Sequence, residues 1–132
     1  MPARNYLALD VGEKRIGLAV ANDDVRIAVP VGWLENTENV ISQIIEELIR
    51  GDISTIVVGY PRNQSGEATL QTEYVEKFVS RLAEIDLDVG IVYQDESLTS
   101  VEAERRLGRV KDKGEIDAEA ASIILQDYLE DL

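Results

Sequence analysis

Apolar positions recur along this chain with two different periods that alternate. Short apolar or alternating runs, typical of strands, are separated by stretches with apolar residues three or four positions apart, typical of helices. The predicted strands are Tyr6–Asp10, Arg15–Ala21, Arg26–Leu34, Ile53–Pro61 and Asp88–Glu96. The predicted helices are Thr37–Arg50, Ala68–Ile85, Thr99–Gly108 and a last helix that begins near Asp117. The order βββαβαβαα indicates an α/β architecture built around one mixed sheet.

Turn and cap residues set several of the predicted boundaries. Gly12–Glu13 and Asn22–Asp24 break the first three runs, so tight turns should join three antiparallel strands. Gly51 is placed as a stop for the first helix, and a capping-box pattern begins at Thr99. Lys111–Gly114 is predicted to be a polar break before the last helix.

Length and composition narrow the class of protein. The chain has 132 residues, about the size of one ordinary domain, so we expect a single domain over residues 1–132. No run reaches the apolar length of a membrane span and no export signal is visible, which predicts a cytoplasmic protein without a membrane partner. Cysteine and histidine are absent, so an enzyme built from this chain would rely on carboxylates, hydroxyls, lysine, tyrosine or a metal.

The charge balance argues against a general nucleic-acid-binding surface, because the net charge is −13. The basic residues are unevenly placed, however, and one cluster has a single acid, Asp112, within it. This cluster, called the basic island below, consists of Arg105, Arg106, Arg109, Lys111 and Lys113. The island could engage phosphates, or its arginines could simply balance the neighbouring Glu102 and Glu104.

Three carboxylates stand at the ends of apolar elements. Asp10 ends the first strand, Glu96 ends the fifth with Asp95 beside it, and Asp117 opens the last helix. If the first and fifth strands lie close together, these acids could meet, and like charges in a partly buried cluster would be costly without a cation. Oxygen-only ligands suit Mg²⁺ or Mn²⁺, and such a site can activate water for phosphodiester cleavage.

Each acid also has a simpler interpretation. Aspartate is common in turns, Asp117 could be the N-cap of the last helix, and Asp95–Glu96 could be a solvated strand end. Spacing cannot choose between Asp95 and Glu96, because alternate residues face opposite sides of a strand. The glycines Gly12 and Gly17 could be hairpin residues and nothing more.

Four ordered blocks carry a resemblance over nearly the whole chain: "LDVGEKRIGLAV", "IVVGYPRNQSGE", "DESLTSVEAERRL" and "IDAEAASIILQDYL". Together they resemble the YqgF/RuvX family of pre-16S ribosomal RNA nucleases, also called Holliday-junction-resolvase-like proteins. The resemblance implies a ribonuclease H-like fold with a five-stranded mixed sheet, flanking helices and metal-dependent cleavage of nucleic acid. Its implied substrate is the 5′ end of the small-subunit ribosomal RNA precursor, with branched DNA as the older attribution.

Carried over residue by residue, the family's acids fall on Asp10, Glu96 and Asp117, which favours Glu96 over Asp95. Some positions depart from the family pattern. Ser97 replaces an arginine that commonly follows the acidic pair, Asn63–Gly66 lacks the acid of the family loop, and Glu13 replaces a small hydroxyl residue. Ala120 stands where the junction resolvases carry a second helix aspartate, so a second metal would bind weakly.

Two other classes of function remain open. An Asp–x–Gly hairpin also begins the actin-like ATPases and sugar kinases, but a second glycine-rich phosphate loop is missing and the chain is too short for two lobes. A non-catalytic ribosome-assembly or interaction module could keep the fold without the activity, and the acidic surface favours this alternative slightly.

The sequence therefore predicts a hydrolase that cleaves phosphodiester bonds with Mg²⁺ or Mn²⁺. Asp10 and Glu96 would hold the metal that activates water, and Asp117 would complete the shell. The expected partner is nucleic acid, pre-ribosomal RNA or branched DNA, and the protein is expected to be a monomer or a homodimer. The predicted phosphate contacts are Lys14, Arg15, Arg105, Arg106, Arg109, Lys111 and Lys113.

Overall fold

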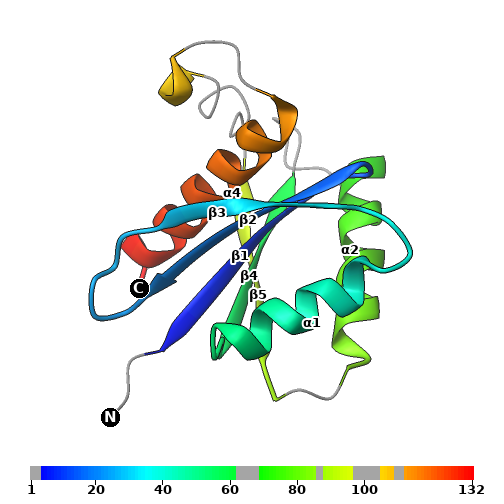
Figure 1. The fold of residues 1–132 in the computed structure, drawn as a ribbon, viewed down its shortest axis with the longest axis horizontal. Coiled ribbons are helices and arrows are strands. Elements are labelled where there is room, and N and C mark those ends of the chain that lie inside the picture. Colours follow the sequence, from blue (N-terminus) through cyan, green and yellow to red (C-terminus); the bar gives the residue numbers. More distant parts are fainter. Residues whose placement is uncertain (1–3, 62–68, 86–87, 97–104, 109–111) are drawn as a thin grey trace.

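A single mixed sheet organises the chain (Figure 1). The computed structural model describes residues 4–61, 69–85, 88–96, 105–108 and 112–132. The sheet has the strand order β3-β2-β1-β4-β5, with β1 antiparallel to β2, β2 antiparallel to β3, and β4 parallel to both β1 and β5. The predicted antiparallel meander is therefore confirmed. The strands are β1 (Asn5–Val11), β2 (Arg15–Asn22), β3 (Val29–Glu35), β4 (Thr55–Pro61) and β5 (Gly90–Glu96).

Helices cover both faces of the sheet. Helices α1 (Val40–Arg50) and α2 (Leu70–Ala83) lie on one face, and α4 (Lys113–Glu130) lies on the other (Figure 1). The order of elements agrees with the predicted one. Of the predicted helix Thr99–Gly108, residues 105–107 are helical and residues 99–104 lie outside the described part of the chain.

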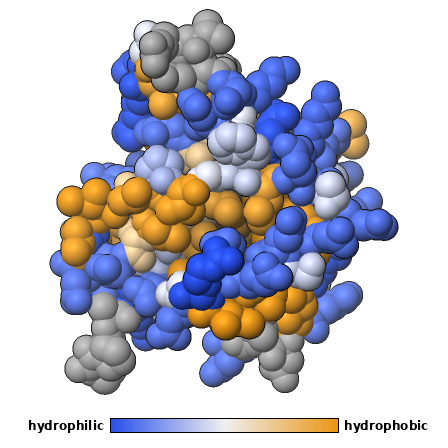
Figure 2. Space-filling model, in the orientation of Figure 1, coloured by the Kyte–Doolittle hydropathy of each residue, from blue (hydrophilic) through white to orange (hydrophobic). Residues whose placement is uncertain are grey.

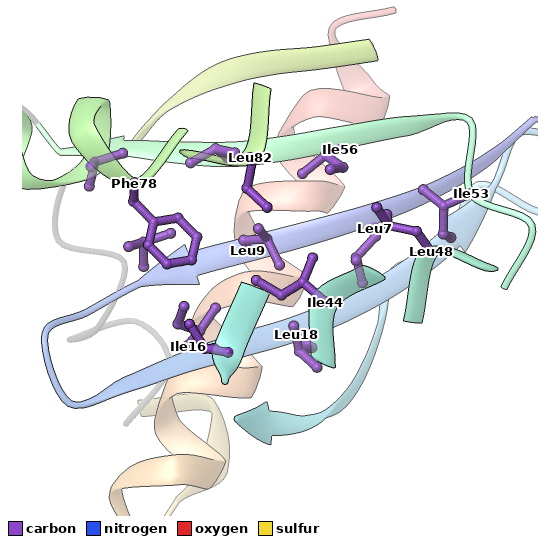
Figure 3. Packing of buried hydrophobic residues seen from close by; sticks show 14 residues of the cluster. Leu7, Leu9, Ile16, Leu18, Ile44, Leu48, Ile53, Ile56, Phe78 and Leu82 are labelled. Atoms are coloured by element: carbon purple, nitrogen blue, oxygen red, sulfur yellow. The ribbon is translucent and has the colours of Figure 1, made fainter. Parts of the chain in front are cut away.

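Alternation along the central strand divides the core into two layers. Leu7, Leu9 and Val11 of β1 point to α1 and α2, where they join Ile44 and Phe78 in a large buried cluster (Figure 3). The intervening Tyr6 and Ala8 point to α4 and belong to a second cluster. Because side chains alternate along a strand, Asp10 follows Tyr6 and Ala8 to the α4 face.

The last helix begins earlier than the sequence predicted. It starts at Lys113, capped by the Asp112 carboxylate, which accepts a hydrogen bond from the Glu115 amide. The predicted polar break at Lys111–Gly114 is therefore wrong for Lys113 and Gly114. Gly114 lies in the first turn of α4, and a Cβ on it would lie 2.1 Å from the Trp33 ring, so only glycine allows the helix to pack against β3 at this point.

Most other boundaries move by a few residues. The first helix begins at Val40, three positions after the predicted Thr37, and ends at Arg50, just before the predicted stop at Gly51. Strand β3 begins at Val29, three positions after the predicted Arg26. Thr69, which forms a reciprocal cap with Thr72, fixes the start of α2. No helix within the described residues is long and apolar enough to cross a membrane.

The β3 edge of the sheet exposes apolar side chains. Val25, Ile27, Val29 and Val31 are each about half exposed or more, and Figure 2 shows apolar surface over this end of the sheet. The edge is irregular: the ladder between β2 and β3 shifts register between Leu18 and Ala19, and Gly32 has a φ of 130°.

Candidate active site

The three predicted acids come from three elements that meet on the α4 face of the sheet. Asp10 lies in β1, Glu96 is the last residue of β5, and Asp117 lies in the second turn of α4. Since the N-cap of α4 is Asp112, the alternative that Asp117 caps the helix is wrong. Asp95 is exposed and lies on the opposite face of β5 from Glu96.

Glu96 reaches toward Asp10 across a strand that separates them. Strand β4 lies between β1 and β5, so the two acids do not stand on neighbouring strands. The strand in between carries Gly59 at the crossing, and a Cβ placed there would lie 2.6 Å from Oε2 of Glu96 and 2.5 Å from Ile124. The absence of a side chain at Gly59 is therefore what lets the Glu96 carboxylate lie over β4.

A second glycine brings the helix close to the sheet. Gly17 of β2 is the ladder partner of Asp10, and a Cβ on Gly17 would lie 1.9 Å from the backbone carbonyl oxygen of Asp117. No other residue type leaves that space. Gly17 is therefore more than a hairpin residue, because it sets the height of Asp117 above Asp10.

The backbone just after Asp10 is held by two amide side chains. The Gln71 side chain donates to the Val11 carbonyl at 3.0 Å, and Asn36 donates to the Gly12 carbonyl at 2.8 Å. Asn36 also donates to the Tyr74 hydroxyl at 2.7 Å. These bonds tie the turn after β1 to α2, which restricts the position of Asp10.

The surroundings of Asp10 and Glu96 disfavour the charged forms of both carboxyl groups. Burial raises the pKa of the Asp10 carboxyl well above its usual range, and the nearby carboxylates of Glu96 and Asp117 raise it further. Burial also raises the pKa of Glu96 to about 7. Within the described residues, Oε2 of Glu96 is buried without a hydrogen-bond partner, which is rare for a carboxylate oxygen.

The third acid has a counter-charge. Nε of Arg15 donates to Oδ2 of Asp117 at 2.7 Å, and each of the two side chains is 23% exposed. Arg15 begins β2 and shares the α4 face with Gly17, two positions along the strand. The predicted phosphate contact Arg15 is thus paired with a predicted metal ligand.

The three acids offer carboxylate oxygens, the kind of ligand that a hard divalent cation prefers. The site offers carboxylate oxygens only, one of them orphaned, and the raised pKa values reflect negative charge that a cation would compensate. In the part of the chain that is described, however, no three such side chains are arranged to enclose an ion as they stand. Asp117 is instead paired with Arg15.

The other predicted phosphate contacts are Lys14 and the residues of the basic island. Lys14 is exposed in the turn before β2, and Lys113 is the first residue of α4. Arg105 and Arg106 are exposed, and Nη1 of Arg106 lies 3.8 Å from Oε1 of Glu119. Arg106 is therefore placed to balance Glu119 of α4. Glu102 and Glu104, like Arg109 and Lys111, lie outside the described residues.

The departures from the family pattern fall in different places. Ala120 is 1% exposed and packs with Ile123, so it offers no ligand and leaves no space for one. Glu13 is exposed in the turn after β1. Ser97 and Asn63–Gly66 lie outside the described residues.

Sequence reasoning missed two features of the site. One is the role of Gly59, and the other is the ion pair between Arg15 and Asp117. A signal for the first was present, because a glycine inside a strand often marks a place where another group approaches closely. The ion pair joins residues 102 positions apart, which no local pattern reveals.

Solved structures with a similar fold include two whose descriptions name the Holliday junction. The T. thermophilus RuvC structure in complex with a Holliday junction substrate superposes with a TM-score of 0.59 at 14% identity, covering 96% of this chain and 94% of that one. The fowlpox virus Holliday junction resolvase gives 0.53 at 14% identity, covering 97% and 99%. These similarities confirm the predicted ribonuclease H-like fold.

Sequence comparison identifies the family. A protein of Chloroflexus aurantiacus named "Putative pre-16S rRNA nuclease" is 43% identical over 131 residues, 94% of this chain and 85% of that protein. A Synechocystis protein of the same name is 40% identical over 94% of this chain and 86% of its own length. The sequence model of the RuvX family, described as Holliday junction resolvase, matches residues 4–131. The chain therefore belongs to the RuvX family.

Proposed function

We propose that this protein is a metal-dependent nuclease that hydrolyses phosphodiester bonds in the precursor of 16S ribosomal RNA. One observation carries the proposal: Asp10, Glu96 and Asp117 converge on one face of the sheet, and Oε2 of Glu96 is buried there without a partner. The names of the curated relatives support ribosomal RNA as the substrate.

Asp10, Glu96 and Asp117 are the residues that would hold Mg²⁺ or Mn²⁺. A bound divalent ion supplies a Lewis acid that lowers the pKa of water and stabilises the leaving oxygen of the phosphodiester. Asp10 and Glu96 must be deprotonated to act as ligands, and the Glu96 pKa of about 7 makes that step sensitive to pH near neutrality. Gly59 and Gly17 position Glu96 and Asp117 beside Asp10.

Lys14 and the basic island would supply the phosphate contacts. An acidic chain repels a polyanion from most directions, so binding has to be focused through these residues and the bound cation. The expected result is weak affinity from few phosphate contacts.

The direct test is cleavage of matched substrates by the purified protein. A precursor RNA with the immature 5′ end, duplex DNA and a four-way DNA junction would each be incubated with Mg²⁺ or Mn²⁺. We expect cleavage of the RNA by the wild type and none by Asp10→Asn, which keeps the shape and removes the charge. Asp95→Asn, on the exposed face of β5, is the matched control. Undiminished cleavage by Asp10→Asn would overturn the site.

A second candidate function is resolution of branched DNA. The description of the family model and the descriptions of the two solved resolvases favour it. Preferential cleavage of the four-way junction over the RNA would select this function. Absence of cleavage on all three substrates, with RNA binding retained, would favour a non-catalytic assembly module.

A further inference from the structure

The ion pair between Arg15 and Asp117 links the start of β2 to α4 within the proposed metal site. Nε of Arg15 lies 2.7 Å from Oδ2 of Asp117, and both side chains are mostly shielded from solvent. Such a charge-assisted hydrogen bond is among the stronger polar contacts in proteins. It leaves the site with one compensated acid, Asp117, and two that no described cation balances, Asp10 and Glu96.

We propose that Arg15 is a built-in counter-ion that competes with the divalent cation for Asp117, and that metal binding displaces it. This inference rests on the proposed function, because it takes Asp10, Glu96 and Asp117 as the ligands. A cation that takes Oδ2 of Asp117 must displace the guanidinium bonded there at 2.7 Å, whereas a cation held by Oδ1 alone would leave the ion pair in place. Arg15 is therefore a positioning residue that acts on the cation through Asp117.

We assign the exchange to the side chains, because the backbone of Asp117 already lies against β2 and cannot move closer to it. Its carbonyl lies where a Cβ of Gly17 would stand, so α4 is pressed against β2 at this point. Rotation of the Asp117 side chain is the movement left, and it fits the finding that no three acids enclose an ion as they stand among the described residues. Arg15 must then turn away from Asp117.

A second acid is available to the displaced guanidinium. Arg15 is paired across the ladder with Glu35 of β3, and directly opposite residues of two strands lie on the same face within side-chain reach. Glu35 is exposed, so this position is open to solvent and to substrate phosphate. The displaced charge is therefore not left buried and unpaired, which would otherwise oppose release strongly.

The inference predicts an unusual sign for a substitution beside a metal site. Arg15→Gln should raise the affinity for Mn²⁺ alone, measured by calorimetry without nucleic acid, by about tenfold, because the competitor is lost. Most substitutions next to a metal ligand lower affinity. Arg50→Gln removes the same charge and an ion pair of similar length, 2.9 Å to Glu47, far from the site on α1, and should leave affinity unchanged.

A double-mutant cycle separates competition for Asp117 from a general effect of charge. In an Asp117→Asn background, Arg15→Gln should change Mn²⁺ affinity by less than about twofold, because the shared partner is gone. A tenfold gain in both backgrounds would mean that Arg15 only raises the local electrostatic potential, which would overturn the inference. Circular dichroism of each variant checks that the fold is kept.

Nuclear magnetic resonance gives a readout that needs no activity. The Nε–H proton of Arg15 should exchange slowly with solvent in the metal-free protein and quickly once Mg²⁺ is saturating. Slow exchange in both states would overturn the inference.

The possible outcomes distinguish failure of the competition by Arg15 from failure of the proposed metal site. If the wild type binds Mn²⁺ through Asp10 and Glu96 and Arg15→Gln binds equally or less well, the metal site stands and the competition is disproved. If neither protein binds Mn²⁺ at millimolar concentration, both the metal site and the competition are disproved.

Discussion

The two faces of the sheet carry different kinds of side chain, although the same strands form both. Toward α1 and α2, β1 presents Leu7, Leu9 and Val11 to a large apolar cluster (Figure 3). Toward α4, the same strand presents Tyr6, Ala8 and then Asp10, beside two glycines on the neighbouring strands. Both faces bury apolar side chains, but on the α4 face the two glycines leave room for the Glu96 carboxylate and the backbone of α4 to approach the sheet.

The comparison indicates that the α4 face loses folding stability because it carries the acids proposed to bind the metal. Burying carboxylates without a counter-charge is unfavourable, and the raised pKa values of Asp10 and Glu96 record that cost. Among the described residues, the buried cluster toward α1 and α2 contains only apolar side chains, and we expect it to supply the compensating stability. Substitutions on the two faces should therefore separate stability from metal binding.

The largest expected effect is on the α4 face, at Glu96. Glu96→Gln should reduce cleavage by about a thousandfold, because loss of a metal ligand removes several kcal/mol of transition-state stabilisation. Asp95→Asn, one residue away on the opposite face of β5, should leave cleavage within about threefold of the wild type. Steady-state cleavage and Mn²⁺ calorimetry on both variants measure this. The reverse ranking would mean that Asp95 is the ligand.

A matched pair of substitutions tests the contrast between the faces. Ile44→Ala in α1 should lower the free energy of unfolding by about 2–5 kcal/mol and leave Mn²⁺ affinity unchanged, because it opens a cavity far from the acids. Gly59→Ala should cost only about 1–3 kcal/mol, yet weaken Mn²⁺ binding, because its Cβ would meet the Glu96 carboxylate. Urea unfolding and calorimetry report the two quantities. Equal metal affinity in both variants would contradict the role of Gly59.

The pH dependence of stability should also differ between the faces. Because burial raises the pKa of Glu96 from 4.5 to about 7, the folded state binds a proton more tightly than the unfolded state. The stability from that proton is fully present below about pH 4.5 and is lost as the pH rises through 7. Between pH 5 and 8, metal-free wild type should lose on the order of 2 kcal/mol relative to Glu96→Gln. Parallel unfolding curves across this range would argue against burial of a charged carboxylate.

The smallest effect concerns the basic island. Replacing Arg105 and Arg106 together by Ala should reduce the slope of log binding constant against log salt concentration by about one, since each neutralised phosphate of a single strand contributes about −0.7. The reduction is limited because Arg106 already lies near Glu119. Arg50→Ala, on α1, is the control for loss of charge. An unchanged slope would mean that the two arginines serve only to balance α4.

Periodicity and turn residues were sufficient to predict the element order and the antiparallel meander, because the alternating runs are local features. They failed at the start of α4, where Asp112 caps the helix and Gly114 packs against Trp33 of a distant strand. The acids were found from their positions and from the family resemblance. Their geometry was not predictable, because it depends on Gly59 and Gly17, whose neighbours come from distant parts of the chain.

The irregular outer strand affects how molecules of this protein meet at high concentration. A long, flat, apolar edge strand would offer unpaired backbone groups to another copy and so promote aggregation. Val29 and Val31 are exposed on such an edge, but the φ of 130° at Gly32 and the register shift beside it bend the strand out of a regular ladder. This bend limits edge-to-edge pairing to short stretches, and it gives the protein a means of staying dispersed that does not depend on its net charge or on salt.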